Sequence, residues 1–212
     1  MTLIPLARDL VILFIALETV SLVSYTLIAH LRGEAGRVEA GLKYMLLGAF
    51  GSAILLMGIA FYFGVTGTTS LDPTRWKMGA DPTGIGWILS TVFILSGLGF
   101  KIACAPFHVY VPDVYQGAPG PISGFLAGAS KAASFLALYA VGSLWLSPAA
   151  DALQGSLGDR EILRNVIRLL AVLTMAWGTV LGVVQTEVKR ILAYSSIAHT
   201  GTMLLFLLVP AQ

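Results

Sequence analysis

The sequence predicts an all-α protein, a bundle of helices that crosses a membrane several times. Of its 212 residues, 57% are hydrophobic and only 11% are charged, whereas a soluble domain carries about 25% charged residues. This deficit is too large for a surface that faces water. The apolar residues also gather in long runs, and a run of about 20 such residues can cross a bilayer as a helix.

The apolar runs divide a single membrane domain, residues 1–212, into about six spans. The first run is too long for the apolar region of a signal peptide and lacks a cleavage site of small residues, so we count it as a span. Longer connections follow the second span, at 65–83, and the fourth, at 147–161. The expected spans cover residues 10–29, 44–64, 84–105, 121–146, 169–185 and 191–209.

The composition excludes several kinds of site in this chain. Cys104 is the only cysteine, so no intramolecular disulfide and no cysteine-ligated zinc or iron–sulfur site is expected. The three histidines stand far apart, and no glycine-rich nucleotide motif is present. The scattered basic residues form no phosphate-binding stripe. We therefore expect this chain to bind no metal, no cofactor and no nucleic acid. We expect the lipid bilayer to surround it.

Three spans each carry one ionisable residue among apolar neighbours: Glu18, Lys101 and Lys131. A charged side chain at the bilayer centre costs roughly 2.5–3.5 kcal/mol even on a lenient insertion scale. Such residues mark functional sites by default. Three of them in one small membrane protein indicate a path for ions or protons.

A proline-rich segment follows Lys101. Proline at positions 106, 112, 119 and 121 removes backbone donors and disfavours helix at the preceding residues. One interpretation is a helix that breaks inside the membrane and resumes after Pro121, where its loose backbone lines a wet cavity. The alternative is an external loop over 106–120, with Lys101 as a snorkelling side chain whose amine reaches the interface.

Lys131 lies deeper inside its span, where snorkelling is harder. Its neighbours at 127–129 and 132–133 are glycine and alanine, which let another helix approach closely. Burial also weakens the preference of a lysine for its charged form, as a proton carrier requires. Glu18 needs a cationic partner, which Lys101 or Lys131 can supply. A static ion pair that only joins two helices is the alternative.

Lys189 and Arg190 stand directly before the last span, and such charges are typical of a membrane interface. Ser195, His199 and Thr202 follow at spacings of four and three residues, so they share one helix face. This stripe predicts either an ordered chain of water or an ordinary polar contact between helices.

Three segments together resemble a known family. They are GLKYMLLGAFGSA at 41–53, the stretch from Lys101 through PFHVYVPDVYQGAP to Pro121, and VKRILAYSSIAHTG at 188–201. Over nearly the whole chain they resemble the antiporter-like membrane subunits of bacterial respiratory complex I, the NADH-quinone oxidoreductase. Mrp-type cation antiporters share the Pro-Phe-His and Pro-Asp elements, whereas the run at 113–119 resembles subunit N in particular.

The resemblance implies roles for the buried residues. Glu18 matches a glutamate of the family's fifth helix, which pairs with a lysine on the broken seventh helix, and Lys101 matches that lysine. Lys131 matches the next lysine along the family's central hydrophilic axis. Three secondary residues also have matches in the family. His108 matches a histidine just past the break, and Lys189 and His199 match a lysine and a histidine around the tenth helix.

The resemblance also implies a function. The chain is expected to be a proton-translocating, multi-pass subunit of an NADH-quinone oxidoreductase in the bacterial inner membrane, driven by quinone reduction elsewhere in the complex. It would be an enzyme subunit without a redox centre. NAD, flavin and iron–sulfur clusters belong to other subunits, and its partners are the other membrane subunits of complex I. The alternatives are a subunit of a multi-subunit Na+/H+ antiporter or a structural fragment that does not conduct.

One departure from the family concerns length. Family members have more than twice as many helices, arranged as two inverted repeats, and this chain matches only about the fifth to the tenth. The antiporter-like fold is therefore expected to be incomplete. Either the sequence is a piece of a longer gene or of a divided protein, or it is a degenerate remnant.

Overall fold

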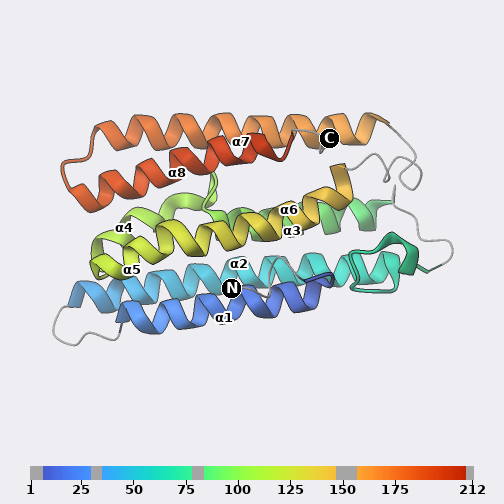
Figure 1. Cartoon of the computed structure of the whole chain (residues 1–212), viewed down its shortest axis with the longest axis horizontal. Coiled ribbons are helices and arrows are strands. Elements are labelled where there is room, and N and C mark those ends of the chain that lie inside the picture. The colour runs from blue at the N-terminus through green and yellow to red at the C-terminus, as the bar shows by residue number, and fades with distance from the viewer. Residues whose placement is uncertain (1–6, 30–34, 78–83, 147–156, 209–212) are drawn as a thin grey trace.

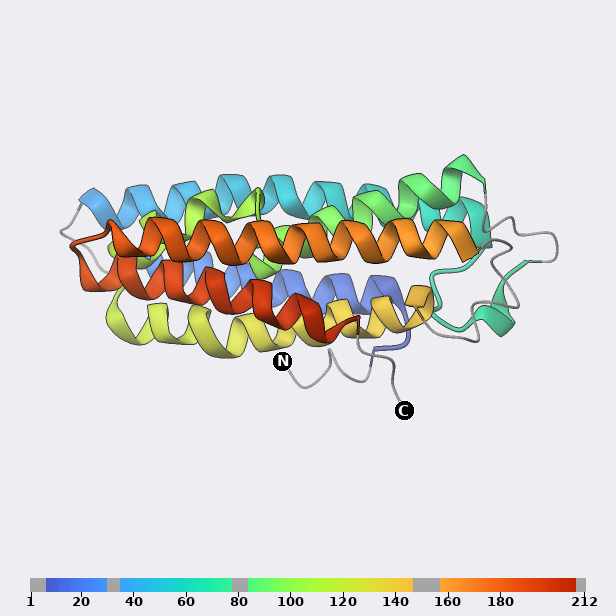
Figure 2. The same ribbon diagram turned by 90° about the horizontal axis from the view of Figure 1, so that it is seen from above.

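The computed structural model describes residues 7–29, 35–77, 84–146 and 157–208. Nearly all of these residues are helical, and the described part of the chain has no strand beyond an isolated bridge between Asp9 and Ser70. The long helices lie side by side with their axes roughly aligned, which gives an elongated bundle (Figures 1 and 2). The predicted fold class, an all-α transmembrane bundle, is confirmed.

Six long helices and several short ones make up the described ranges. The long helices are α1 (Leu10–Ala29), α2 (Ala35–Thr66), α3 (Ile85–Ile102), α6 (Lys131–Leu146), α7 (Leu157–Val183) and α8 (Val188–Phe206). The short ones are η1 (Pro73–Arg75), η2 (Phe107–Tyr110), α4 (Val111–Gly117), α5 (Gly120–Phe125) and the π-helical turn η3 (Leu126–Ser130). All of the short helices except η1 lie between α3 and α6.

Among the residues described, the segments that are long and apolar enough to cross a membrane are Leu10–Ala29, Val38–Thr66, Ile85–Gly117, Gly120–Gly142 and Glu161–Val183. The sixth expected span, 191–209, corresponds to α8, which is not among these five. Its 19 residues include Lys189, Arg190 and His199 together with several serines and threonines, so its composition is more polar. This helix lies along α7 in the bundle (Figure 1).

Several helix ends differ from the expected ones; α2, for example, begins at Ala35 rather than at residue 44. Two of the differences have a clear local reason. α3 ends at Ile102 rather than at Ala105, because Ala103 adopts a left-handed backbone conformation (φ 60°, ψ 46°) that closes the helix. α7 begins well before its apolar run, and polar contacts support its early turns. There Arg168 donates hydrogen bonds to Glu161 and to Asn165.

The bundle has three layers (Figure 1). Helices α1 and α2 form one outer layer, α7 and α8 form the other, and α3 to α6 lie between them. Apolar side chains cover much of the outer surface, among them Ile15, Leu46, Phe50 and Val180. Such an exterior suits lipid, whereas the middle layer is enclosed by protein on two sides.

Glycine allows the closest contacts between helices. A Cβ atom on Gly97 of α3 would lie 2.5–2.8 Å from the Cβ, Cα and N atoms of Leu55 on α2. In the opposite outer layer, a Cβ atom on Gly178 of α7 would lie 2.6 Å from the backbone nitrogen of Ala198 on α8. Because these neighbours include backbone atoms, both helix pairs need a small residue at the point of contact.

Gly97→Ala should therefore destabilise the bundle. The added methyl group meets the backbone of Leu55, so α2 and α3 must separate, and we expect the free energy of unfolding to fall by about 1–3 kcal/mol. The control is Gly64→Ala at the end of α2, where a Cβ atom has no neighbour within 4 Å. Thermal unfolding in detergent, followed by circular dichroism, measures both. Equal midpoints for the two variants would contradict the close contact.

Candidate functional site

The candidate site is built around the break in the third span. After α3 ends at Ile102, the chain continues through η2, α4 and α5 before α6 begins. The residues that follow the break, Ala103, Cys104 and Ala105, are at most 5% exposed. The segment packs between α2 and α8 and contributes to the core. Because residues 107–117 are helical and pack against these two helices, the structure favours the broken-helix interpretation over an external loop at 106–120.

Side chains from other helices satisfy the backbone groups that the break leaves free. The N–H of Ala105 donates to the hydroxyl of Thr174 on α7 (2.9 Å). The hydroxyl of Thr200 on α8 can donate its single proton to the carbonyl of Ile102 (3.1 Å) or to that of Ser196 on its own helix (3.0 Å). The carbonyl of Phe100 accepts from the N–H of Ala103 (3.1 Å) and also from the hydroxyl of Tyr110 (3.0 Å). Because no water is available in hydrocarbon, these contacts are what make the break possible at this depth.

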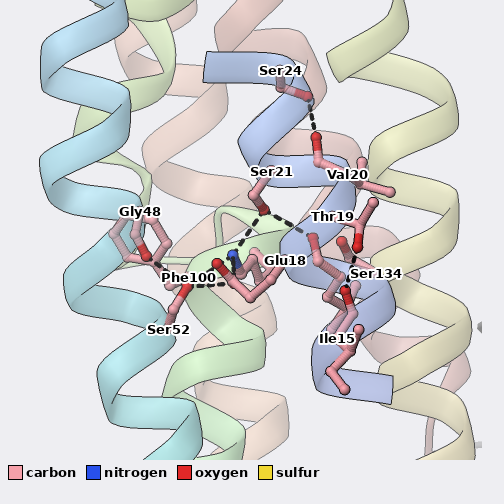
Figure 3. Close-up of polar contacts among 12 residues, drawn as sticks. Ile15, Glu18, Thr19, Val20, Ser21, Ser24, Gly48, Ser52, Phe100 and Ser134 are labelled. Atoms are coloured by element: carbon pink, nitrogen blue, oxygen red, sulfur yellow. Dashed lines mark hydrogen bonds and ion pairs between the residues drawn. The ribbon is translucent and has the colours of Figure 1, made fainter. Parts of the chain in front are cut away.

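Glu18 and Lys101 form a buried ion pair just before the break (Figure 3). The Nζ atom of Lys101 lies 2.6 Å from Oε1 of Glu18, and the two side chains are 8% and 19% exposed. The amine also donates to the hydroxyls of Ser21 (2.9 Å) and Ser52 (3.1 Å). Lys101 therefore points into the protein, and the snorkelling interpretation is wrong.

The hydroxyl of Ser52 connects the two members of the pair. It accepts a hydrogen bond from Lys101, and its single proton can be donated either to Glu18 or to the carbonyl of Gly48 (2.9 Å). With Glu18, Ser21 and Ser52 as acceptors, all three N–H groups of a protonated Lys101 are in use. The ammonium group of Lys101 is thus fully satisfied, as a charge in a medium of low dielectric requires.

Lys131 is buried, with 7% of its surface exposed. Its amine donates to the carbonyl of Ser196 (2.9 Å) and to the hydroxyl of Thr200 (3.1 Å), both on α8. No ion pair joins it to a carboxylate in the described part of the chain, unlike Lys101. The π-helical turn η3 ends directly before it, and such turns occur frequently at functional sites.

Cavities lie on both sides of Lys131. A cavity of about 20 Å³ separates it from Lys101, and both lysines line its wall. This space is enough for a water molecule. On the other side, Lys131, Lys189, Ser195 and His199 line a much larger cavity of about 520 Å³. Water in the smaller cavity can therefore bridge the two buried amines, and we call Lys101 and Lys131 together the lysine row.

The secondary residues fall into two groups. Lys189 and His199 share the larger cavity with Lys131. His108 on η2 is buried and meets the ring of Trp177 edge to face (5.9 Å between centroids). Within the described residues its Nδ1 atom has no hydrogen-bond partner, and none of its hydrogen bonds reaches the lysines. The structure thus brings two of the three predicted secondary residues to the lysine row.

The expected stripe on the last helix is only partly correct. Ser195 and His199 line the larger cavity, but Thr202 is exposed and its hydroxyl donates to its own helix, at Ala198 (3.4 Å). The residue that faces inward is Thr200, which contacts Lys131 and Ile102. Spacing alone grouped Thr202 with His199 and passed over Thr200. Polar and apolar residues are mixed on every face of this helix, so the sequence does not show which face turns inward.

Sequence patterns also missed a polar network that holds α4. Asp113 pairs with Lys43 on α2 (3.3 Å) and with Arg190 on α8 (2.9 Å). Lys189 donates to the carbonyls of Gln116 (3.3 Å) and Ala118 (2.8 Å), at the C-terminal end of α4. A cation at that end of a helix is favourable. Lys189 and Arg190 therefore fasten α4, in addition to any preference for a membrane interface.

A bundle of membrane-spanning helices with a buried carboxylate–lysine pair beside a broken helix, and a second buried lysine beyond it, defines an antiporter-like membrane protein. Comparison with known proteins identifies the family. The chain belongs to the NADH:quinone oxidoreductase/Mrp antiporter transmembrane family, whose model matches residues 7–212. The resemblance found in the motifs is thus confirmed, as is a multi-pass protein of the bacterial inner membrane.

Individual relatives agree with this assignment. The chain is 41% identical over 206 residues to NADH-quinone oxidoreductase subunit N of Sphingopyxis alaskensis, covering 97% of this chain and 41% of that protein. It resembles a chain of respiratory complex I from Thermus thermophilus with 39% identity and a TM-score of 0.77, over 95% of this chain and 40% of that one. A chain of the Mrp complex from Dietzia sp. has a TM-score of 0.80 at 24% identity, over 95% of this chain and 36% of that one. This likeness shows a common fold only. The chain spans about two fifths of the length of the curated relatives.

Thr200→Val should loosen the contact between α8 and the lysine row. Valine has nearly the same shape, but without the hydroxyl Lys131 loses an acceptor and Ile102 loses a donor. We expect the free energy of unfolding to fall by about 1–3 kcal/mol, as for a buried polar group left unsatisfied. Thermal unfolding of the chain in lipid nanodiscs measures the change.

The matched control is Thr202→Val on the same helix, whose hydroxyl is exposed and contacts only its own helix. Its unfolding midpoint should stay close to that of the unmodified chain. If the two valine variants unfold alike, the hydroxyl of Thr200 does not support the site.

Proposed function

We propose that this chain forms a proton-translocating part of a bacterial NADH-quinone oxidoreductase. The observation that carries the proposal is the row of buried ionisable groups, in which the Glu18–Lys101 pair is followed by a small cavity and by Lys131. These groups take up and release protons without any cofactor. The name of the relatives, NADH-quinone oxidoreductase subunit N, supports the choice of complex.

The ion pair is the element that controls the first proton. An ion pair at about 4 Å contributes roughly 4 kcal/mol at an effective dielectric of about 20. If Glu18 moves away from Lys101, this stabilisation is lost while the amine stays desolvated. Lys101 then releases a proton from Nζ toward Lys131, and water in the cavity between them carries it. Return of Glu18 favours uptake of a new proton by Lys101.

Lys131 is suited to receive that proton. A neutral lysine amine has two N–H donors and one lone pair. The two acceptors on α8, Ser196 and Thr200, match the two donors of the neutral form. The lone pair is then left to accept a proton, and among the described residues no carboxylate forms an ion pair with Lys131 that would retain the charge. Lys131 therefore passes the proton on readily.

The larger cavity continues the path beyond Lys131. Lys189 and His199 line it and are the groups that would take the next proton. His108 lies apart from this row in the described structure, so a role for it in proton transfer remains a prediction from the family resemblance. The coupling energy would come from quinone reduction in other subunits.

The assembly follows from the same proposal. The chain would act as one membrane domain in the inner membrane, without a redox centre, as a subunit of an enzyme. Its partners would be the other membrane subunits of respiratory complex I, while NAD, flavin and iron–sulfur clusters would lie in other subunits.

The alternative functions differ in their observable consequences. A Na+/H+ antiporter subunit would use the same lysines, and the Mrp-like fold is compatible with it, but at 24% identity that likeness extends to the fold alone. A structural fragment would keep the bundle without conducting. Sodium-dependent proton exchange without NADH oxidation distinguishes the first alternative, and the absence of any proton flux distinguishes the second.

Lys101→Ala, made in the assembly that contains this chain, should lower proton translocation roughly tenfold or more, because the first proton carrier is removed. Proton uptake by membrane vesicles, measured with a pH-sensitive dye and divided by the rate of NADH oxidation, gives the effect. The control is Lys77→Ala, whose exposed amine donates to the carbonyl of Gly64 and has no link to the buried ionisable groups in the described part of the chain. An unchanged ratio of protons to NADH in Lys101→Ala would refute the proposal.

A further inference from the structure

We propose that a small cavity beside Lys101 holds one ordered water molecule, and that the hydroxyl of Tyr25 keeps this water in place. The cavity has a volume of about 10 Å³ and lies where α1, α2, α3 and α6 meet. Its wall includes Ser21, Lys101, Ser130 and Ser134 together with Tyr25. A buried water needs about this much space and two to four polar partners.

The hydroxyl of Tyr25 indicates that a water molecule binds in this cavity. Its side chain is 7% exposed, and its buried hydroxyl makes no hydrogen bond of good geometry in the described part of the chain. The neighbouring hydroxyl of Ser21 is already engaged, because it accepts from Lys101 and donates to the carbonyl of Leu17. Buried hydroxyls in native proteins are nearly always paired, either with a protein group or with an ordered water. Since the hydroxyl belongs to a residue that lines the cavity, the water in the cavity supplies that pairing.

The surroundings hold the Tyr25 ring in one position. The ring meets Tyr44 edge to face, with 4.7 Å between the ring centroids. Its hydroxyl lies against Gly48 on α2, where a Cβ atom would be 2.0 Å from the oxygen. Only glycine at position 48 admits the hydroxyl. The carbonyl of the same glycine accepts from Ser52, which also contacts the ion pair, so the hydroxyl is fixed beside the charged groups.

The hydrogen bonds already made indicate how the water is bound. All three N–H groups of Lys101 are used in the closed ion pair, so the amine does not donate to the water in that state. Ser134 donates its proton to the carbonyl of Ser130 (3.0 Å) and keeps its oxygen lone pairs. The water therefore accepts from Tyr25 and donates to serine oxygens such as that of Ser134.

The position of the water gives it a consequence for proton transfer. When the ion pair opens, one N–H group of Lys101 becomes free beside a water that is already oriented toward α6. Ser130, which lines the cavity, ends η3, and Lys131 begins α6 directly after it. Tyr25 is thus a positioning residue for the first proton transfer. This consequence rests on the proposed function, whereas the water site itself does not.

The first test looks for the water directly. Cryo-electron microscopy of the intact membrane assembly, at a resolution that shows bound waters, is compared for the native chain, Tyr25→Phe and Tyr139→Phe. Tyr139 is a tyrosine on α6 that is 55% exposed and does not line the cavity. We expect one water peak in the native chain and in Tyr139→Phe, and none in Tyr25→Phe. An empty cavity in the native chain, or a water retained in Tyr25→Phe, would overturn the water site.

Gly48→Ala provides a second variant that leaves every hydroxyl in the sequence. Its methyl group occupies the place of the Tyr25 oxygen, so the water should again be lost. Infrared difference spectra in H₂¹⁶O and H₂¹⁸O give an independent readout. An O–H stretching band that shifts with the oxygen isotope should be present in the native assembly and missing in both variants; its persistence in both would also overturn the site.

The second test measures the consequence. Tyr25→Phe should lower the ratio of protons translocated to NADH oxidised about fivefold, as expected for the loss of one hydrogen bond at the transfer step. Tyr139→Phe should leave it unchanged. An undiminished ratio in Tyr25→Phe would overturn the positioning role. If instead Lys101→Ala has no effect while the water disappears in Tyr25→Phe, the proposed function fails and the water site stands.

Discussion

The ion pair between Glu18 and Lys101 is the interaction on which the rest of the structure depends. A single charge in a membrane interior costs several kcal/mol, and a pair is tolerated only when its remaining donors are satisfied as well. Here the amine of Lys101 on α3 meets the carboxylate of Glu18 and a hydroxyl on α1, and a second hydroxyl on α2. Three helices are thereby joined at one point. Because the contact needs groups from all three helices, a small movement of any one of them weakens it. The pair is therefore suited to control when Lys101 releases a proton.

The break after Lys101 imposes a second constraint, because free backbone groups in hydrocarbon need partners from elsewhere in the protein. Thr174 on α7 and Thr200 on α8 supply them, so the outer layer formed by these helices supports the break directly. Thr200 has a further role, since its hydroxyl also accepts from Lys131. One side chain therefore couples the broken helix to the second lysine. This coupling explains why a helix with the polar composition of α8 lies beside the lysine row.

Residue type was enough to find the principal groups of the site. Buried charges are costly, so Glu18, Lys101 and Lys131 stand out against apolar neighbours, and the prolines after Lys101 mark the break. The hydroxyls that complete the site were not found, because serine and threonine occur throughout membrane helices without a function. Ser52 contacts Glu18 across 34 positions of sequence, and no local pattern reports such a contact. Asp113 likewise gave no sign that it pairs with both Lys43 and Arg190.

The sequence by itself determined the class of fold, the place of the break and the identity of the buried charges. Each of these follows from local chemistry, namely apolar length, proline geometry and the free-energy cost of an isolated charge. Only the tertiary structure decided that Ser52 completes the ion pair, that Thr200 rather than Thr202 faces Lys131, and that a cavity remains beside Tyr25. These depend on the rotation of each helix about its axis and on the distance between helices. Packing of all the layers sets both quantities together, so no single segment contains them.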